Sequence, residues 1–293
     1  FGPNMAACQA SIELGVSGPV LGGVGACAAG VLAVVEGLRL VQHGEADVVI
    51  AAGTDAALSP VLLGSLANAG ALAGAGDDPA AACRPFDRRR DGMVASEGAA
   101  AFVLEPLERA VARGATPVAV VAGGGRSADA HHVTAPHPEG RGTAAALRRA
   151  LADAGLEPTG VDAVVAHATA TRAGDVAEVR ALRAVFGDHL PSLAVTAPKG
   201  ALGHSLGAAG AFGVLVAALA LGDQALPPTR NLDDADPACA GPAHVTAGPR
   251  RGRLRAVVVD AAGFGGQSAV VVLAAAPPPV PRDIRPGVGT VSP

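Results

Sequence analysis

The chain has almost no aromatic side chains: tryptophan and tyrosine are absent, and six phenylalanines bring the aromatic content to only 2% of 293 residues. The net charge is −4 at pH 7, and lysine occurs once, at position 199. A nucleic-acid-binding surface needs clustered basic residues, so this composition argues against a nucleic-acid partner. It also provides no basic face for binding an anionic membrane.

Cysteine is rare as well, and its four positions are far apart: Cys8, Cys27, Cys83 and Cys239. None of them forms the Cys-x-x-Cys spacing of a zinc or redox motif, and the wide separation does not indicate a disulfide framework. We therefore expect free thiols and a cytoplasmic location. Three histidines cluster in a proline-containing loop, but they lack helical spacing and a nearby cysteine, so no metal site is predicted. They are His131, His132 and His137.

Apolar residues are abundant: they make up half of the chain, the mean hydropathy is +0.38, and there are 40 glycines. This composition predicts a large core built from closely packed, small-residue helices. One uncharged run, 205–222, is long enough to raise the question of a membrane span. Its glycines and the histidine just before it favour a buried helix instead, and we predict no membrane association.

Apolar runs alternate with amphipathic segments along most of the chain, which is the pattern of an α/β fold. Strands are expected at 48–52, 99–104, 118–122, 161–166, 193–196, 254–259 and 268–273. Helices are expected at 5–14, 31–41, 107–113, 142–154, 175–185 and 205–222. A short buried strand is expected just before Cys27, and a solvated charged loop is expected at 84–92. The strand at 118–122 is expected to be interrupted at Gly123-Gly124-Gly125.

Cys27 lies in Gly25-Ala26-Cys27-Ala28-Ala29-Gly30, where a helix is predicted to begin. The unpaired N–H groups and the dipole of a helix N-terminus favour a thiolate, which is the nucleophilic form of cysteine. The small neighbouring residues would let a substrate approach closely. The alternative interpretation is a buried free cysteine that acts as a small apolar side chain.

Two histidines stand at positions that suit catalysis. His167 follows a predicted buried strand, where α/β sheets place ligands, and His204 precedes a small-residue helix. A helix N-terminus keeps an imidazole neutral, and a neutral imidazole can donate a hydrogen bond to a developing oxyanion. Each histidine alone could be structural. Lys199 adds weight, because arginine carries nearly all other positive charge and cannot replace a compact ammonium group.

A weak internal repeat links the two halves. Ala28-Ala29-Gly30 opens one predicted helix and Ala208-Ala209-Gly210 opens another, each just after an active-looking residue. Such a repeat would place the two helix N-termini near a shared axis. Chance similarity between helices rich in glycine and alanine is the alternative.

Together these motifs resemble the β-ketoacyl-acyl carrier protein synthases of the thiolase-like superfamily, from about Asn4 to Leu273. The likeness is carried by Ala26-Cys27-Ala28, Arg84-Pro85-Phe86-Asp87, Asp129-Ala130-His131-His132, His167-x-Thr169-x-Thr171-x-x-Gly174-Asp175-x-x-Glu178, Lys199-x-x-x-Gly203-His204, Pro227-Pro228-Thr229 and Gly263-Phe264-Gly265-Gly266. The resemblance implies a layered αβαβα fold with two pseudo-repeated halves, the N-terminal half being truncated. The expected division is 1–115, 116–275 and a Pro-rich, disordered tail at 276–293.

The resemblance also implies a role for each matched residue. Cys27 would carry the acyl chain, and its N–H and that of Phe264 would form the oxyanion hole, with Phe264 also acting as a gate. His167 and His204 would stabilise the enolate formed from malonyl-carrier protein. Lys199 would pair with Glu178. Thr169 and Thr171 would bind the phosphopantetheine arm of an acyl carrier protein, so that no separate cofactor is needed.

Three positions depart from the family pattern. Ala168 replaces a glycine, and its methyl group could crowd the site. Asp260-Ala261-Ala262 replaces the usual Asn-Ser-Phe, and Gln267-Ser268 replaces Thr-Asn. The last change favours ketosynthase pairs of secondary metabolism.

The resulting prediction is decarboxylative Claisen condensation in type II fatty acid or polyketide synthesis, by a homodimer or a ketosynthase heterodimer. One alternative is a non-catalytic chain-length-determining partner subunit, which Cys27 argues against and Ala168 and Ala262 mildly favour. Another is a thiolase that acts on coenzyme A esters, but Cys239 lies in no motif for the second cysteine that this requires.

Overall fold

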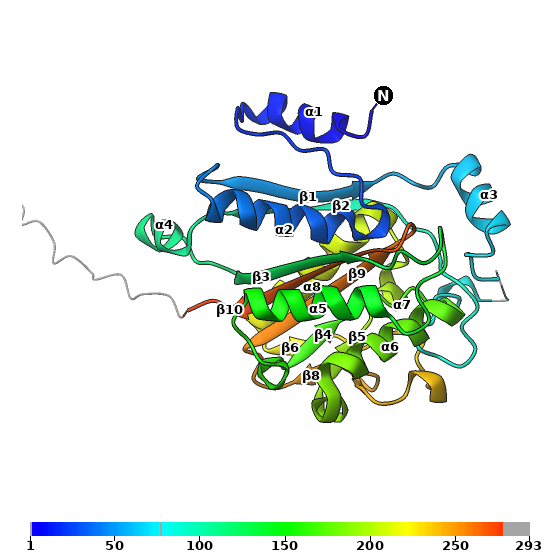
Figure 1. Ribbon diagram of the computed structural model, residues 1–293. Coiled ribbons are helices and arrows are strands. Elements are labelled where there is room, and N and C mark those ends of the chain that lie inside the picture. The colour runs from blue at the N-terminus through cyan, green and yellow to red at the C-terminus, as the bar shows by residue number, and fades with distance from the viewer. Residues whose placement is uncertain (1, 75, 77, 278–293) are drawn as a thin grey trace, which may run out of the picture.

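The computed structural model describes residues 2–74, 76 and 78–277, and a six-stranded mixed sheet forms its centre (Figure 1). The strand order is β3-β10-β9-β4-β5-β7, antiparallel from β3 to β9 and parallel from β9 to β7. These strands are β3 (Ala119–Ala128), β4 (Ala163–Val165), β5 (Ala194–Thr196), β7 (Ala243–His244), β9 (Ala256–Gly263) and β10 (Gln267–Ala275). Two antiparallel pairs complete the strands: β1 (Val49–Asp55) with β2 (Gly98–Leu104), and β6 (Ala225–Leu226) with β8 (Arg250–Arg251).

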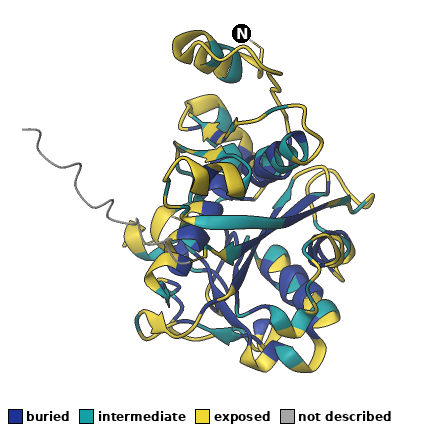
Figure 2. Cartoon of the chain, turned by 90° about the vertical axis from the view of Figure 1, so that its left-hand side faces the viewer, coloured by how far each residue is buried: buried dark blue, intermediate teal, exposed yellow. Residues whose placement is uncertain are grey.

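Helices cover both faces of the central sheet, giving a layered thiolase-like arrangement (Figures 1 and 2). The α-helices are α1 (Met5–Leu14), α2 (Ala29–Gln42), α3 (Pro60–Asn68), α4 (Leu107–Ala112), α5 (Arg141–Asp153), α6 (Arg172–Phe186), α7 (Lys199–Leu202) and α8 (Ala209–Asp223). α2 and α8 lie between the sheet and the β1–β2 pair, and α5 and α6 cover the opposite face. Short 3-10 helices, η1 (Ala26–Ala28) and η5 (Leu206–Ala208), come directly before α2 and α8.

Alternating valines divide the core into two clusters. On β9, Val257 and Val259 belong to the cluster with α2 and α8, whereas Val258 belongs to the cluster with α5 and α6. On β10, Val271 and Val270 divide in the same way. Because successive side chains of a strand point to opposite faces, the continuous valine runs bury both sides of the sheet.

The expected repeat has a structural counterpart at the N-termini of α2 and α8. A Cβ added at Gly210 would lie 2.8 Å from the backbone nitrogen of Val31, and one added at Gly30 would meet the backbone nitrogen of Ala211. The two helices therefore contact each other backbone to backbone, which only glycine allows. This contact brings η1 and η5, and with them Cys27 and His204, to the same end of the α2–α8 layer.

The prediction that the strand would be interrupted at the three consecutive glycines was wrong. β3 runs through them from Ala119 to Ala128, and α5 packs directly on this part of the strand. A Cβ at Gly123 would lie 2.7 Å from the carbonyl oxygen of Ala150, and one at Gly125 would meet Ala146. The glycines thus permit close helix–strand packing rather than a turn.

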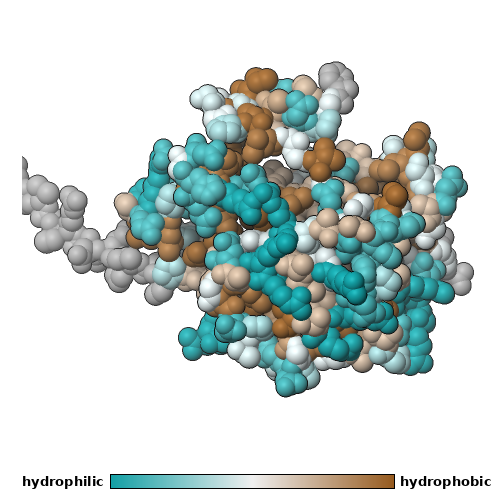
Figure 3. Space-filling model, viewed as in Figure 1, coloured by the Kyte–Doolittle hydropathy of each residue, from teal (hydrophilic) through white to brown (hydrophobic). Residues whose placement is uncertain are grey.

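The buried strand expected just before Cys27 is also not found. Residues 16–25 form no strand and pair with no other strand of the described chain; Leu21 and Val24 are 55% and 70% exposed. The preceding helix α1 forms as expected and ends at Gly15, but it contains no buried residue. Figure 3 shows apolar side chains exposed on this helix, at the top of the view.

The charged loop at 84–92 is buried at its centre rather than solvated. Arg90 is 3% exposed and forms ion pairs with Asp236, at 2.6 Å, and with Asp175, at 3.6 Å. Asp87 is fully buried and accepts the backbone N–H groups of Asp233 and Asp234. Sequence alone did not reveal these partners because they lie more than 80 residues away.

One helix of the described chain, Leu206–Asp223, is apolar and long enough to cross a membrane, but half of this segment is buried. α8 packs against β9, β10 and α2, which makes it a core helix as expected. Most of the expected Pro-rich tail, 278–293, lies outside the described residues.

Candidate active site

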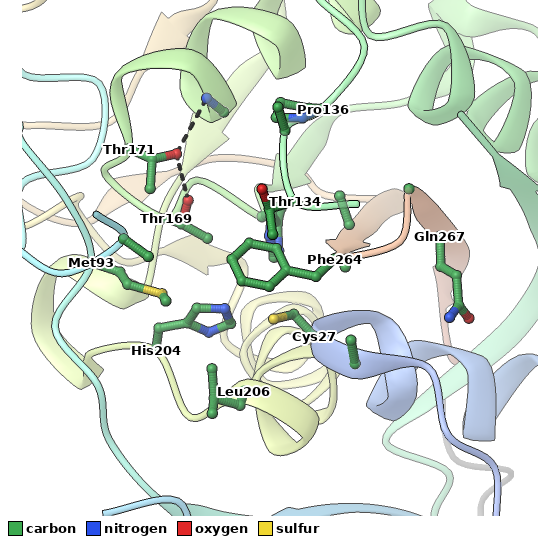
Figure 4. A pocket seen from close by; sticks show the side chains of 18 of the residues that line it. Cys27, Met93, Thr134, Pro136, Thr169, Thr171, His204, Leu206, Phe264 and Gln267 are labelled. Carbon is green, nitrogen blue, oxygen red and sulfur yellow. Dashed lines mark hydrogen bonds between the residues drawn. The ribbon is translucent and has the colours of Figure 1, made fainter. Parts of the chain in front are cut away.

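A cavity of about 360 Å³ opens where η1, η5 and the carboxyl ends of β4 and β9 meet. It collects residues from positions 26 to 267 of the chain, including Cys27, His167, Thr169, Thr171, Glu178, His204 and Phe264. Figure 4 shows the sulfur of Cys27 and the ring of His204 facing the same space, with the ring of Phe264 beside them. The structure thus brings every predicted site residue except Lys199 to the wall of one cavity.

Cys27 lies in η1, immediately before α2, as the sequence predicted. Ala26 before it has a φ of +45°, a strained conformation that turns the cysteine toward the cavity. Gly263, at the end of β9, lies so close that an added Cβ would be 2.9 Å from the carbonyl oxygen of Gly25. This close contact brings Phe264 beside the nucleophile.

The expected thiolate is not favoured at rest. Burial raises the pKa of the Cys27 thiol to about 11, because the free-energy cost of removing a thiolate from water exceeds the stabilisation that nearby groups provide. The positive charge of Lys199 and hydrogen bonds from the N–H groups of Cys27 and Phe264 oppose this shift. These are the two N–H groups expected to form the oxyanion hole.

The two imidazoles form a pair above the thiol. Their ring centroids are 5.6 Å apart, with an edge-to-face angle of 86°. His204 is 1% exposed, and its backbone N–H donates to the carbonyl of Val94 at 2.7 Å. Burial lowers the pKa of both His167 and His204 well below the usual value, and the charge of Lys199 lowers it further. Both rings are therefore neutral, as expected, although burial rather than the helix N-terminus is the main cause.

The exposure of the ring nitrogens indicates which of them carries the proton. The Nδ1 atoms of His167 and His204 are buried and have no partner among the described residues. A buried N–H without an acceptor is costlier than an unused lone pair, so the proton belongs on Nε2. Each ring then presents an N–H donor toward the cavity.

Lys199 is buried beneath the histidines, and its Nζ donates to the carbonyl oxygen of His167. Lys199 and Glu178 form no ion pair within 4.0 Å in the described chain, although Glu178 is the negative group that most favours the charged form of Lys199. The Glu178 carboxylate instead accepts the backbone N–H groups of His167 and Ala168, both at 2.7 Å. The lysine and the glutamate thus hold opposite ends of the same short backbone segment.

Thr169 and Thr171 line the wall of the cavity below its mouth. Their hydroxyl oxygens are 3.1 Å apart, and that of Thr171 also accepts the N–H of Gly174 as the N-cap of α6 (Figure 4). Phe264 is 39% exposed at the mouth and is followed by two glycines with φ of +85° and +76°. Backbone freedom at these glycines suits a side chain that must move aside.

Ala168 does not crowd the cavity. Its φ of +29° is strained for alanine, and its methyl group is fully buried in the cluster with α5 and α6, so it does not line the site. Ala262, by contrast, does line the cavity, where the missing aromatic side chain leaves room.

Sequence reasoning missed the apolar branch of the cavity. It is lined by residues of α3, of the loops that follow it and of η5: Leu62, Leu66, Ala71, Met93 and Leu206. Ser59 caps α3 and Pro60 begins it, a signal that predicts the helix but not its contact with the cavity. Asp55, at the end of β1, was also missed; it accepts the N–H of Gly207 at 3.0 Å and so fixes η5.

The histidine loop is built differently from a metal site. Within the described residues, no group of three potential ligands is placed to hold a metal ion. The Nδ1 atom of His132 accepts the backbone N–H groups of Thr134 and Ala135, at 3.1 Å and 3.0 Å. This loop forms part of the cavity wall through Thr134, Ala135 and Pro136.

Comparison with known proteins agrees with this geometry. Residues 2–110 match the family model "Beta-ketoacyl synthase, N-terminal domain", and residues 118–233 match "Beta-ketoacyl synthase, C-terminal domain". The chain is 42% identical over 270 residues to 3-oxoacyl-[acyl-carrier-protein] synthase 2 of Synechocystis, covering 90% of this chain and 64% of that protein. It is 41% identical to the enzyme of the same name from Coxiella burnetii, covering 63% of it. The chain thus spans slightly less than two-thirds of the length of these curated relatives.

Solved structures give the same result. A type II polyketide synthase ketosynthase, in complex with its acyl carrier protein and bound to the hexaketide, matches with a TM-score of 0.91 and 30% identity, over 94% of this chain and 67% of that one. The ishigamide ketosynthase/chain length factor matches with a TM-score of 0.79 and 38% identity, over 86% of this chain and 60% of that one. A cavity that joins one cysteine to two neutral histidines, two matching domain models and these fold matches lead to one conclusion: the chain belongs to the beta-ketoacyl synthase family.

Proposed function

We propose that this protein catalyses decarboxylative Claisen condensation between an acyl thioester on Cys27 and a malonyl thioester carried by an acyl carrier protein. The observation that carries the proposal is the convergence of Cys27, His167 and His204 on one cavity, which Phe264 also lines. Fatty acid or polyketide synthesis of type II would supply both substrates, and the cytoplasm would be the site of action.

The first half-reaction is acyl transfer. The thiol of Cys27 is protonated at rest, so it must lose its proton as it attacks, and the departing carrier thiolate takes up that proton. The thiolate then attacks the thioester carbonyl, and the carrier thiol leaves with the proton. The N–H groups of Cys27 and Phe264 stabilise the tetrahedral oxyanion.

The second half-reaction is condensation. The Nε2–H groups of His167 and His204 would donate to the malonyl thioester oxygen while the C–C bond to the carboxylate breaks and carbon dioxide leaves. The resulting enolate carbon attacks the acyl carbonyl on Cys27, a C–C bond forms, and the cysteine sulfur departs and regains a proton. Neutral imidazoles suit this role, because developing negative charge strengthens their hydrogen bonds.

The acyl chain would occupy the apolar branch beyond Cys27, among Leu66, Met93 and Leu206. The phosphopantetheine arm of the carrier protein would enter at the mouth, where the hydroxyl groups of Thr169 and Thr171 can bind its amides. Movement of Phe264 would open the way to the thiol.

A partner subunit, either a second copy or a related ketosynthase chain, would cover apolar surface that the described chain leaves exposed. Leu21 and Val24 lie on the unpaired segment before Cys27, and Val103, on the outer face of the β1–β2 pair, is 64% exposed. Light scattering on the purified chain, alone and mixed with a candidate partner, would test this assignment; a monomer under both conditions would contradict it.

The central experiment is acylation of the protein by acyl-carrier protein, followed by peptide mass spectrometry. We expect one adduct on Cys27, which should be lost in Cys27→Ala and retained in Cys239→Ala. Cys239 is the matched control because its thiol is also buried but lies away from the cavity. His204→Ala should abolish malonyl decarboxylation and largely retain acylation of Cys27. An intact protein that takes up no acyl group from any donor would instead support the non-catalytic, chain-length-determining role.

A further inference from the structure

Asp260 has an environment that its sequence position did not reveal. It lies on β9, one residue past the parallel pairing with β4, and is 3% exposed. Its Oδ1 accepts the backbone N–H of His167 at 3.3 Å. Its Oδ2 is buried and receives no hydrogen bond from any described residue. An amide at this position could donate a hydrogen bond as well as accept one, whereas an ionised carboxylate only accepts.

Glu178 occupies the same small volume. Its Oε1 accepts the same N–H of His167 at 2.7 Å, so one donor is shared between two carboxyl groups. Two ionised carboxylates this close together repel each other, and burial strengthens the repulsion, so a proton held by the pair relieves it.

The surrounding charges lead to the same requirement. The charged and titratable groups that face the pair are Lys199 of α7, Asp175 of α6, Cys27 of η1, and the rings of His167 and His204. Asp175 has its own partners, since it accepts the N–H of Phe86 at 2.7 Å and lies 3.6 Å from Arg90. Both histidines and the thiol are neutral. Lys199 therefore provides one positive charge for two buried carboxyl groups, which one proton would balance.

We propose that Glu178 and Asp260 share a single proton, and that this acid–carboxylate pair is a positioning device for His167. The pair binds the backbone N–H of His167, while Lys199 binds its carbonyl oxygen, so both ends of the residue are held by one charge-balanced cluster. The role given to His167 rests on the proposed function; the shared proton does not.

The direction of the acid–base shifts agrees with the proposal. Burial raises the pKa of Glu178 well above its usual value, and the neighbouring Asp260 raises it further. Burial raises the pKa of Asp260 to about 6, opposed by its contact with Glu178. The two carboxyl groups therefore titrate as a pair, which holds its last proton more tightly than an isolated carboxyl group does.

Infrared difference spectroscopy of the full chain at pH 8 tests the shared proton without requiring turnover. We expect one protonated-carboxyl C=O band in the unmodified protein. This band should disappear in both Asp260→Asn and Glu178→Gln, because the remaining carboxyl group is then balanced by Lys199 and ionises. Asp162→Asn, at the start of the strand that leads to His167, is the matched control and should retain the band.

Two results would overturn the proposal. A band that survives in Asp260→Asn but not in Glu178→Gln would assign the proton to Glu178 alone. The absence of any band at pH 8 in the unmodified protein would show that both carboxyl groups are ionised, and this result needs no variant to fold.

The positioning role has its own measurement, namely the rate of malonyl decarboxylation. Asp260→Asn still offers an oxygen to the N–H of His167, so we expect its rate to remain within about threefold of the unmodified protein. Asp260→Leu offers no acceptor and should lose at least about tenfold, since small displacements of catalytic groups are costly. Equal rates for the two variants would rule out positioning. If the unmodified protein shows the infrared band but does not decarboxylate malonyl thioesters, the proposed function is contradicted, whereas the proposal of a shared proton still holds.

Discussion

At the scale of single residues, burial decides the chemistry of the site more than local sequence does. The helix start at Cys27 was predictable from the small residues around it, but the raised pKa of its thiol was not. That shift comes from removing the sulfur from water, and the elements that bury it are scattered along the chain. The neutral state of His204 was predicted from its position at a helix N-terminus, but burial is the main cause of its lowered pKa.

The raised pKa of Cys27, about 11, predicts how its reactivity depends on pH. The thiolate fraction should grow roughly tenfold per pH unit up to the pKa, so alkylation of Cys27 by iodoacetamide should accelerate steadily from pH 6 to about pH 10. Peptide mass spectrometry can follow Cys27 separately from Cys8. A plateau near neutral pH would instead reveal a thiolate–imidazolium pair in the resting protein.

The raised pKa of Asp260 predicts that the stability of the folded chain depends on pH. Its pKa is raised from 3.8 to about 6 in the folded chain, so between these values the folded state binds more protons than the unfolded state. Stability linked to this residue is therefore greatest below about pH 4 and is lost as pH rises through 6. Asp260→Asn should be more stable than the unmodified protein by about 1 to 3 kcal/mol at pH 7.5, and equal to it near pH 4. Urea unfolding at the two pH values measures the difference; an equal gain at both would exclude a titration effect.

At the scale of elements, the two 3-10 helices and the long helices that follow them form the frame of the site. Ala26 and Leu206 open them with φ of +45° and +46°, and the contact between Gly30 and Gly210 places them side by side. One half of this frame presents the thiol of Cys27 to the cavity, and the other presents the imidazole of His204.

Replacing Gly210 should therefore be costly. In Gly210→Ala the new methyl group would lie 2.8 Å from the backbone nitrogen of Val31, which cannot move without displacing α2. We expect a loss of about 1 to 3 kcal/mol of stability, together with slower acylation of Cys27. Gly222→Ala, on the same helix but with nothing within 4 Å, is the control and should stabilise by about 0.5 to 1 kcal/mol. Similar denaturation midpoints for the two variants would contradict the close contact.

Secondary structure was predictable where periodicity is local, and unpredictable where contacts are distant. The helix at 5–14 and five of the six strands of the central sheet follow from patterns within each segment, whereas the two-residue strand β7 was missed. The glycines of β3 and the buried arginine of the loop at 84–92 were misread because the partners that explain them, α5 and α6, come later in the chain. The family motifs identified the residues that the structure brings to one cavity, but not the N–H donor of His167 that Asp260 and Glu178 share.

At the scale of the whole molecule, the cavity joins elements that lie far apart in the sequence. Its apolar branch reaches α3, whose residues Leu62 and Leu66 line it, whereas Val61 on the same helix is 81% exposed. The chemistry is thus set by the α2–α8 frame, and the room for substrate is set by a separate helix.

This separation predicts that acyl chain length can be changed without loss of the reaction. Leu66→Trp should fill the apolar branch and shorten the longest acyl group that Cys27 accepts, with short donors transferred at rates within about threefold of the unmodified protein. Val61→Trp, which faces solvent, should leave the chain-length profile unchanged. Mass spectrometry of the acylated protein with donors of increasing length measures the profile, and an unchanged profile in Leu66→Trp would place the acyl chain elsewhere.

The only lysine of the sequence lies beneath the two imidazoles and is 7% exposed. An amine-specific reagent therefore finds no side-chain target on the surface and can modify Lys199 only when the interior opens. The rate of that modification would therefore measure how often the structure around the two imidazoles opens, so Lys199 can serve as a probe of local unfolding at the proposed active site.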